Sequence, residues 1–240
     1  MNFLKKPNLP EQPVKLVLAA QSMDEAIKNE LYRHGVSAVY VYPNRFVDSP
    51  ISDHPDISFL HIGDNKLLCG EGSNASFDGY PVETVKIAEK FGRRYPDDVL
   101  LNCAIIGKYA VCNKKYVSAS LLDAHFTPID TRQGYAKCST AIVSETAIIT
   151  EDESIANAVR TVGIDALLIQ KGSVRLNGYN YGFIGGACGK ISSNVLAFFG
   201  KIENHPDYHF IKAFCKNHGV DLLSLSNNEL FDYGGLIPLA

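Results

Sequence analysis

The chain has 240 residues, of which 46% are hydrophobic and 20% are charged, and its formal net charge is -3. These values suit one globular domain over residues 1–240, and they exclude the basic surface that binding to nucleic acid or to an anionic membrane requires. The N-terminus has no long apolar run and is read neither as a signal peptide nor as a membrane span, so we expect a cytoplasmic protein.

Six cysteines are scattered through the chain without any Cys-x-x-Cys spacing. Most of them sit inside apolar runs, where a reduced thiol packs as a small hydrophobic group. We therefore predict neither disulfides nor a metal site. The glycines form no Gly-x-x-x-x-Gly-Lys phosphate-binding signature, so no nucleotide or other cofactor is expected.

The N-terminal region predicts an arm followed by a strand, a helix and a second strand. Residues 1–13 are rich in Pro and Lys and are expected to pack on the body of the molecule, and residues 15–20 read as a buried strand. A helix is predicted to open at Ser22, where a glutamate three residues later completes a capping box, and to end at Gly35. Residues 36–42 form the next predicted strand.

The order of helix, glycine and strand recurs along the chain, which indicates a repeat architecture of ββαβ units. The predicted strand pairs of the first four units are residues 56–62 and 66–69, 100–106 and 109–112, 136–143 and 146–149, and 181–189 and 194–199. The predicted helices are residues 81–91, a turn near 118–122, a helix from Thr150 with a second capping box, and residues 206–218, and the third and fourth units end in strands at 166–169 and 219–225.

A fifth unit begins at Tyr233 and can be completed only by the N-terminal strand, helix and strand. Such a chain closes on itself, which removes the free sheet edges of an open array. Two local phrases accompany this pattern. Residues 54–59 read His-Pro-Asp-Ile-Ser-Phe, and Gly234 and Gly235 form a pair close to the C-terminus.

This arrangement resembles the pentein fold, the five-bladed α/β propeller with pseudo-fivefold symmetry of the guanidino-group modifying enzymes. That superfamily includes arginine deiminases, dimethylarginine hydrolases, agmatine deiminases and amidinotransferases. The phrase at residues 54–59 is similar to the Pro-Asp-x-x-Phe phrase of the family's first unit, and the terminal Gly-Gly falls where the family places a nucleophilic Cys shortly afterwards. The chain looks most like an uncharacterised bacterial branch, whose activity the resemblance does not supply.

The resemblance implies a thiolate nucleophile, a His acid and base, and carboxylates that hold the cationic substrate. Pro238 or a neighbour stands where the thiol is expected, so the terminal nucleophile is absent. The family's general base would fall near residues 137–139, and one substrate carboxylate near residues 101–104, and neither is written there.

Asp56 is the carboxylate that matches the family's phrase, with His54 two residues before it. The functional interpretation is a carboxylate that binds ammonium or guanidinium, flanked by a His that serves catalysis. The structural interpretation is a strand entry in which Pro55 stops a turn and Asp56 caps it. The same His-Pro-Asp letters occur at residues 205–207, where they simply begin a predicted helix.

Cys188 is the candidate nucleophile, because residues 185–189 repeat the Gly-Gly-x-Cys spacing of the family in the fourth unit. Pseudo-fivefold symmetry would aim its thiol at the same central channel. The alternative is inert packing, since Cys138 and Cys103 occupy corresponding strand positions in other units. Further polar groups expected to face a ligand in the channel are Asn102, Lys137, Ser139 and Asp232, and residues 69–80 and 171–182 have the composition of binding loops or lids.

Two functions from different classes follow. In the first, the protein has lost the family's nucleophile and binds a small cationic or guanidino ligand, or a protein of unknown identity, as the ribosome anti-association factor of archaea and eukaryotes does within this fold. In the second, it is a hydrolase or transferase acting on a guanidino-type small molecule, with Cys188 as displaced nucleophile and His54 and Asp56 as acid and base. The absent terminal Cys favours binding.

Overall fold

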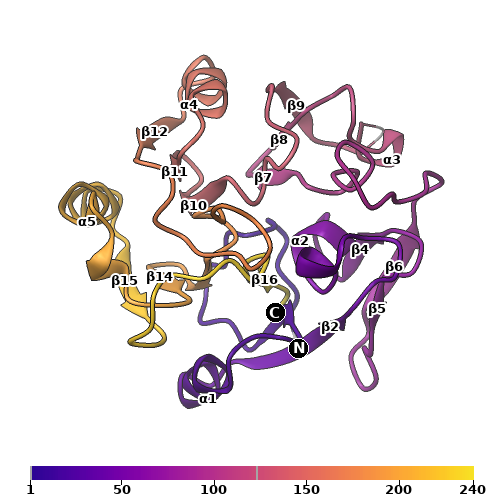
Figure 1. The fold of residues 1–240 in the computed structure, drawn as a ribbon, viewed down its shortest axis with the longest axis horizontal. Coiled ribbons are helices and arrows are strands. Elements are labelled where there is room, and N and C mark those ends of the chain that lie inside the picture. The colour runs from indigo at the N-terminus through magenta and orange to yellow at the C-terminus, as the bar shows by residue number, and fades with distance from the viewer. Residues whose placement is uncertain (1, 123) are drawn as a thin grey trace.

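The computed structural model describes residues 2–122 and 124–240, whose strands form five small sheets. Figure 1 shows these sheets lying around the middle of the molecule, with α1 (Glu25–Arg33), α4 (Glu153–Arg160) and α5 (Tyr208–Asn217) towards the outside. Two short helices, α2 (Pro55–Ser58) and α3 (Ala119–Leu122), and two 3-10 turns, η1 (Ser49–Ile51) and η2 (Ile202–Asn204), complete the helical segments of the described chain. No helix in this part of the chain is both long and apolar enough to cross a membrane.

Each described sheet is built on the same pairing rule. One sheet has the order β16 (Ile237–Pro238), β1 (Leu16–Ala20), β2 (Ser37–Tyr42) and β5 (Asn74–Ala75). The others are β3 (Phe59–His61), β4 (Lys66–Cys69) and β6 (Glu83–Lys86); β7 (Ala104–Ile106), β8 (Tyr109–Cys112) and β9 (Thr127–Asp130); β10 (Thr140–Ser144), β11 (Ala147–Thr150) and β12 (Asp165–Leu168); and β13 (Cys188–Ser192), β14 (Val195–Phe198) and β15 (Asp221–Ser224). Strands β1, β4, β8, β11 and β14 each pair antiparallel with one neighbour and parallel with another.

The first and last strands of the chain lie in one sheet. β1 pairs antiparallel with β16, with Val17 opposite Pro238 and Leu18 opposite Ile237, and it pairs in parallel with β2 on its other side. The backbone N–H of Leu4 donates to the carbonyl oxygen of Leu239 at 2.9 Å, which brings the N-terminal arm to the same place.

β1 is buried on both faces, which explains its unbroken run of apolar residues. Leu16 and Leu18 pack in a cluster with Leu67 of β4, whereas Val17 packs in a second cluster with Ile27 of α1. Alternate side chains of the strand therefore join two neighbouring units of the molecule.

The predicted helix over residues 81–91 is wrong, because this segment contains the strand β6. The spacing of its apolar residues breaks the helical period between Val85 and Ile87, and its β-branched residues suit a strand. β4 supplies parallel backbone partners, with Lys66 opposite Glu83, while Ile87 and Phe91 anchor the following turn in the core.

The predicted strand over residues 181–189 is also displaced. Local turns replace it, since the N–H groups of Gly186 and Ala187 both donate to the carbonyl of Phe183, and β13 begins only at Cys188. These turns leave the segment free to curve around the middle of the molecule.

Both predicted capping boxes lie too early. α1 is capped by Asp24, whose carboxylate accepts from the N–H of Ala26 at 2.7 Å, and α4 by Asp152. The hydroxyl of Thr150 instead donates to the carbonyl of Ser139 at 2.7 Å. The other predicted elements agree with β1, β2, α3, β4, β8, β11, β12, β14, β15 and α5 to within a few residues, and β9 was not predicted.

Candidate functional site

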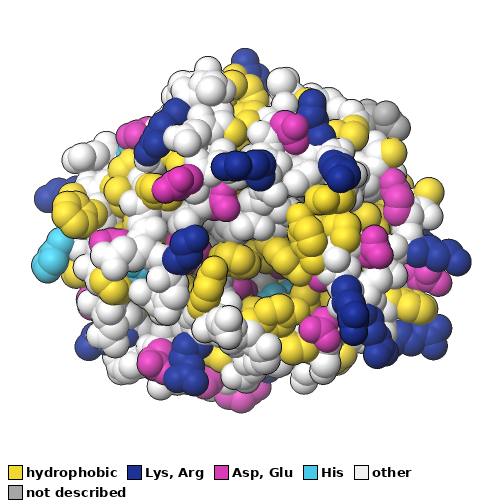
Figure 2. Space-filling model, turned by 45° about the horizontal axis from the view of Figure 1, so that its top comes forward, with side chains coloured by type: hydrophobic (Ala, Val, Ile, Leu, Met, Phe, Trp, Pro, Cys, Tyr) yellow, Lys and Arg dark blue, Asp and Glu magenta, His cyan; other side chains and the backbone are white. Residues whose placement is uncertain are grey.

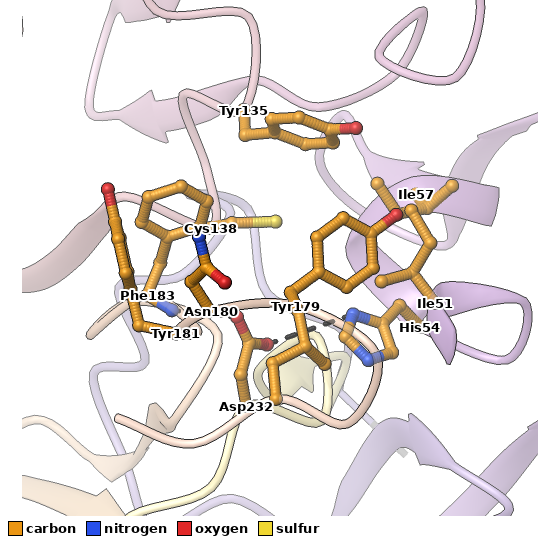
Figure 3. A pocket seen from close by; sticks show the side chains of 11 residues that line it. Ile51, His54, Ile57, Tyr135, Cys138, Tyr179, Asn180, Tyr181, Phe183 and Asp232 are labelled. Atoms are coloured by element: carbon orange, nitrogen blue, oxygen red, sulfur yellow. Dashed lines mark hydrogen bonds and ion pairs between the residues drawn. The ribbon is translucent and has the colours of Figure 1, made fainter. Parts of the chain in front are cut away.

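A cavity of about 230 Å³ lies where α2, the turn before β10, the loop before β13 and the segment before β16 meet (Figure 3). Its lining residues come in four groups: Ile51, His54 and Ile57; Tyr135 and Cys138; Leu176, Tyr179, Asn180, Tyr181 and Phe183; and Asp232. Most of the lining is apolar or aromatic, and the polar groups converge from separate units of the chain. This combination is typical of a small-molecule site.

The walls of the cavity are aromatic. Phe183 contacts Tyr135 and Tyr181, with ring centroids 6.2 and 5.9 Å apart. The Tyr135 hydroxyl donates to Asp98 Oδ2 at 2.6 Å, and the Tyr179 hydroxyl donates to Asp48 Oδ2 at 3.0 Å. These bonds hold the two rings with their polar ends anchored and their faces available to a ligand.

The anchoring bonds also change the acidity of the groups involved. Burial, followed by the bond to Asp98, raises the pKa of Tyr135, and burial with the bond to Asp48 raises the pKa of Tyr179 to about 12. Burial likewise raises the pKa of Asp98, against the opposing effect of Tyr135. Both phenols therefore stay protonated around neutral pH and act as hydrogen-bond donors.

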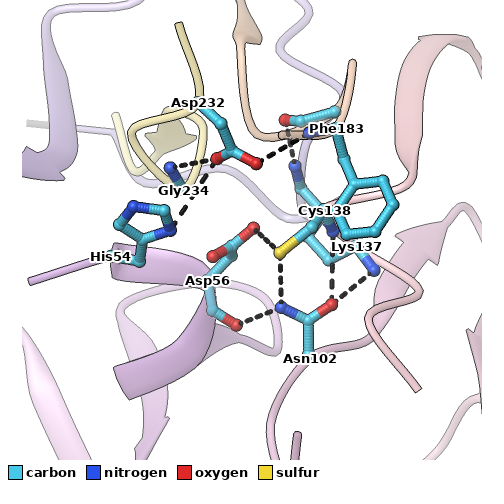
Figure 4. Close-up of polar contacts among 9 residues, drawn as sticks. His54, Asp56, Asn102, Lys137, Cys138, Phe183, Asp232 and Gly234 are labelled. Carbon is cyan, nitrogen blue, oxygen red and sulfur yellow. Dashed lines mark hydrogen bonds and ion pairs between the residues drawn. The ribbon is translucent and has the colours of Figure 1, made fainter. Parts of the chain in front are cut away.

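One polar side of the cavity is formed by Asp232 and His54 (Figure 4). Asp232 is 1% exposed, and its two carboxylate oxygens accept from the N–H groups of Gly234 and Phe183, each at 2.9 Å. His54 is 3% exposed; its Nδ1 lies 3.7 Å from Asp232 Oδ1 and has no hydrogen-bond partner among the described residues.

The glycines beside this pair are required by close packing. A Cβ on Gly186 would collide with the carboxylate of Asp232, and a Cβ on Gly234 would lie 2.5 Å from that of His54. Gly234 also has a φ of +74°, which L side chains rarely adopt. The repeated Gly-Gly phrase thus lets Asp232 and His54 approach the backbone.

Asp56, Cys138 and Asn102 form a second polar group next to the first. The thiol of Cys138 donates to Asp56 Oδ2 at 3.0 Å, and Asn102 Nδ2 donates to Cys138 Sγ at 3.0 Å and to the Asp56 carbonyl at 3.0 Å. Asn102 Oδ1 accepts from the backbone N–H groups of residues 137 and 138 at 2.8 and 3.2 Å. Asp56 is 1% exposed, and its Oδ1 has no partner among the described residues.

Burial raises the pKa of Asp56 to about 6, although the positive charges of Lys137 and His54 oppose this shift. Burial also raises the pKa of the Cys138 thiol well above its usual range, and the nearby charges of Asp56 and Asp232 raise it further. At neutral pH the empty site therefore holds an ionised Asp56 carboxylate beside a neutral thiol.

Glu151 lies behind the same loop. Its Oε2 accepts from the N–H of Ile184 at 3.2 Å, next to the N–H of Phe183 that Asp232 accepts, while its Oε1 has no partner in the described chain. Burial raises the pKa of Glu151 to about 8. Two carboxyl groups thus hold consecutive backbone amides of the segment that carries the aromatic wall.

The predicted site residues divide into three positions. His54 and Asp232 line the cavity, and Asp56 and Asn102 lie in the polar group beside Cys138. Lys137 is buried below them, with its ammonium donating to the carbonyl of Gly185 at 3.3 Å.

Cys188 and Ser139 lie away from the cavity lining. Cys188 is 2% exposed within an apolar cluster, and burial raises its pKa to about 12. Ser139 is buried, with its backbone carbonyl accepting from Thr150. Sequence reasoning treated Cys138 only as a packing residue and missed the wall formed by Tyr135 and Phe183, whereas the loop over residues 171–182 was expected to form a binding edge and supplies Tyr179 and Tyr181.

All six cysteines are free and buried. Within residues 2–122 and 124–240, no group of three or more His, Cys, Asp or Glu side chains is arranged to hold a metal ion. The chemistry open to the cavity is therefore that of its carboxylates, imidazole, thiol and aromatic rings.

The model of a protein family described as "Family of unknown function (DUF6873)" matches residues 18–237. No curated protein matches the chain. Similarity to solved structures, in contrast, extends over nearly the whole length.

An inosamine-phosphate amidinotransferase from Streptomyces griseus is similar with a TM-score of 0.56 at 9% identity, over 97% of this chain and 95% of that one. An amidinotransferase of the saxitoxin biosynthetic pathway from Microseira wollei gives 0.52 at 10% identity, over 92% and 91%. An agmatine deiminase from C. jejuni gives 0.53 at 10% identity, over 92% and 90%. At these identities the likeness shows the fold alone, and it confirms the resemblance to the guanidino-modifying enzymes that the sequence predicted.

Proposed function

Because the chain belongs to the family of unknown function DUF6873 and has the fold of guanidino-modifying enzymes, we propose that its cavity binds a small guanidino-type cation. The observation that carries this proposal is the pairing of aromatic walls with two almost fully buried carboxylates, Asp56 and Asp232. The structural neighbours supply the chemical class, since their names refer to agmatine and to amidino transfer.

A planar cation satisfies several groups of the cavity together. Its charge would offset the burial of Asp56, whose Oδ1 lacks a partner in the described chain, and its N–H groups would donate to that oxygen. Its face would lie against the rings of Tyr135, Tyr179 or Phe183, where cation–π attraction is strongest in a dry site. No Lys or Arg belongs to the described lining, so a ligand that carries a carboxylate would find no counter-charge there.

The cavity volume also limits the ligand. Drug-sized ligands occupy pockets of roughly 300–1,000 Å³, and the present cavity has about 230 Å³. We infer a ligand of about the size of a guanidinium group attached to a short chain or one ring.

We further propose that the sheets are the blades of a closed five-bladed propeller that forms one domain over residues 1–240, with residues 1–13 as an arm. Support comes from the shared pairing rule of the described sheets and from the pairing of β1 with β16. In that arrangement the cavity would occupy the middle of the ring, where strand ends from several blades converge.

Two functions remain distinct within this proposal: a binding protein without the family's terminal nucleophile, and a hydrolase or transferase that uses Cys188. The burial of Cys188 outside the cavity lining supports the first. Binding of a cation through Asp56 and the aromatic walls requires neither Pro238 to be replaced nor Cys188 to react.

The proposal is tested by isothermal titration of the full chain with phenylguanidine, a planar cation, and with phenylurea, its neutral isostere. We expect phenylguanidine to bind about ten-fold more tightly or better, since one charge-assisted hydrogen bond contributes about 1.5–3 kcal/mol. Asp56→Asn should remove this preference, whereas Asp221→Asn, an exposed carboxylate on β15, should leave it unchanged.

The pH dependence gives an independent check. Affinity for phenylguanidine should fall as the pH drops through about 6, because Asp56 then becomes protonated. Equal affinity for the two compounds, or binding that ignores pH and Asp56→Asn, would reject the cation site.

A further inference from the structure

Cys138 is the thiol that faces the cavity. It belongs to the turn that precedes β10, and Figure 3 shows its sulfur pointing into the space between the aromatic rings. Its position is fixed from two sides, since Asn102 Oδ1 accepts from its backbone N–H at 3.2 Å and the N–H of Ser139 donates to the carbonyl of Tyr135 at 3.0 Å. A buried side chain held in this way has one direction available.

The sulfur lies between a proton acceptor and a hydrogen-bond donor. Asp56 Oδ2 accepts the thiol proton at 3.0 Å, and the amide of Asn102 donates to the sulfur, also at 3.0 Å. The first contact is the geometry of a general base at a nucleophile, and the second stabilises negative charge on sulfur. Packing alone requires neither contact, because a cysteine in an apolar core needs no polar partner.

A second, independent observation points to a ligand at the same place. His54 Nδ1 and Asp56 Oδ1 have no hydrogen-bond partner within the described residues, although His54 is 3% and Asp56 is 1% exposed. Unpaired buried polar atoms are costly and are expected to be satisfied by something bound. Cys188, by comparison, is surrounded by apolar side chains of β14 and α5.

We propose that Cys138 is the nucleophile of this pocket and that it attacks an electrophilic carbon carried by the bound cation, with Asp56 as proton acceptor and Asn102 as positioning residue. On an amidinium or guanidinium carbon, the S–H bond breaks and its proton passes to Asp56 Oδ2. The sulfur electron pair forms the S–C bond, and the C=N π pair moves to nitrogen, which neutralises the cation. The inference rests on the proposed cation binding and goes beyond it, because binding alone requires no thiol.

A bound cation supplies the activation that the empty site lacks. Negative charge on Asp56 and Asp232 disfavours a thiolate at Cys138, and a positive ligand next to them removes that penalty. The thiol should therefore react selectively with cationic electrophiles and remain inert towards neutral ones.

This selectivity is measured by alkylating the native full-length chain with 2-chloroacetamidine, a cation, and with 2-chloroacetamide, its neutral isostere. In both reactions the S–C bond forms, the C–Cl bond breaks, chloride leaves and the thiol proton passes to Asp56. Each rate is divided by the rate with glutathione, which removes intrinsic differences in reactivity, and the modified cysteine is located by mass spectrometry.

We expect Cys138 to be labelled, with a normalised preference for the cation of about ten-fold or more, the effect of lowering a thiol pKa by one unit at fixed pH. Cys138→Ser should abolish the labelling, Asp56→Asn should reduce the preference towards one, and Cys215→Ala, which removes a buried thiol of α5, should change nothing. A preference of one, labelling of Cys188, or no labelling before unfolding would each overturn the inference.

The titration with phenylguanidine separates this inference from the proposed function. If Cys138→Ser and the wild type both bind phenylguanidine while Cys138 resists the cationic reagent, the cation site stands and the nucleophile is rejected. If phenylguanidine does not bind and Cys138 is not labelled, both are rejected. The Asp56→Asn chain retains Cys138, so it provides a readout even if Cys138→Ser fails to fold.

Discussion

At the scale of single residues, the loop that walls the cavity is held by two carboxyl groups of different character. Asp232 accepts from the N–H of Phe183 and also from that of Gly234, whereas Glu151 accepts only from the N–H of Ile184. Two backbone donors satisfy a buried carboxylate much better than one. Glu151 is consequently the group whose protonation should affect the stability of the fold.

Glu151→Gln should make the protein more stable at alkaline pH. The pKa of Glu151 is about 8 in the folded chain against 4.5 in the unfolded chain, so the folded state retains a proton that the unfolded state loses. Stability from this group is complete below about pH 4.5 and declines as the pH rises to about 8. Gln keeps an oxygen for the N–H of Ile184 and does not ionise.

Thermal melting from about pH 5 to about pH 9 checks this expectation, with a gain of a few kcal/mol, of the order of one pKa unit to three, at the alkaline end. Glu153→Gln, an exposed neighbour in the first turn of α4, is the matched control. Curves for wild type and Glu151→Gln that run parallel across this range would contradict the assignment.

Most of the polar residues of the site could be predicted from sequence, because a local phrase located His54 and Asp56 and the repeat pattern located Asn102 and Asp232 at equivalent unit positions. The choice of thiol could not. Whether Cys138 or Cys188 faces the cavity depends on a turn that Asn102 holds through its contacts with residues 137 and 138. Those contacts join segments more than thirty residues apart (|i−j| of 35 and 36), and no local pattern records them.

At the scale of elements, the loop between β12 and β13 meets η1 across the mouth of the cavity. Tyr179 bonds to Asp48, and Gly178 lies so close to Pro50 that a Cβ there would come within 2.8 Å of the ring. The other end of the loop is tied to the body, since Arg175 pairs with Phe231 as an isolated parallel bridge. The loop is therefore anchored at both ends, and its contact with η1 depends largely on one phenol.

Tyr179→Phe should accelerate exchange of the ligand without removing its aromatic contact. The lost bond is to a charged acceptor, but Tyr179 is 41% exposed, so we discount its contribution to about 1 kcal/mol. Stopped-flow measurements with phenylguanidine should give a dissociation rate about five-fold higher and a smaller change in affinity. Tyr32→Phe, at a 78% exposed position on α1, should behave as wild type. An unchanged dissociation rate in Tyr179→Phe would show that the mouth opens elsewhere.

Elements with a clear apolar period, such as α4 and α5, could be predicted from sequence, and β6 could not. Its four residues are all exposed, so no alternation of burial marks it, and its strand character comes from pairing with β4. Tertiary hydrogen bonding decided the structure of this segment over local propensity.

At the scale of the whole molecule, β1 joins the two ends of the chain. It is buried on both faces and hydrogen-bonded on both edges, to β16 and to β2. Its side chains also belong to two separate apolar clusters. The repeat pattern of the sequence led to this partnership, because the fifth unit lacked any other strands to complete it.

Deletion of residues 1–20 should abolish cooperative unfolding. It removes β1 completely, exposes the apolar faces of two clusters and leaves the edge of β2 unpaired. Circular dichroism during thermal unfolding should show no sharp transition. Lys6→Ala, which removes only the exposed ion pair with Glu145, should shift the transition by less than about 1 kcal/mol. A truncated chain that melts like the wild type would reject the proposed closure.

The meeting of both ends within one sheet has a genetic consequence. A chain of this kind has no architectural beginning, because the contact between Leu4 and Leu239 places its ends where a short peptide would connect them. New ends at the exposed turn around Gly163, where a Cβ would meet nothing within 4 Å, would leave every sheet intact. The order of units in the gene is then one of several circular permutations that encode the same set of contacts.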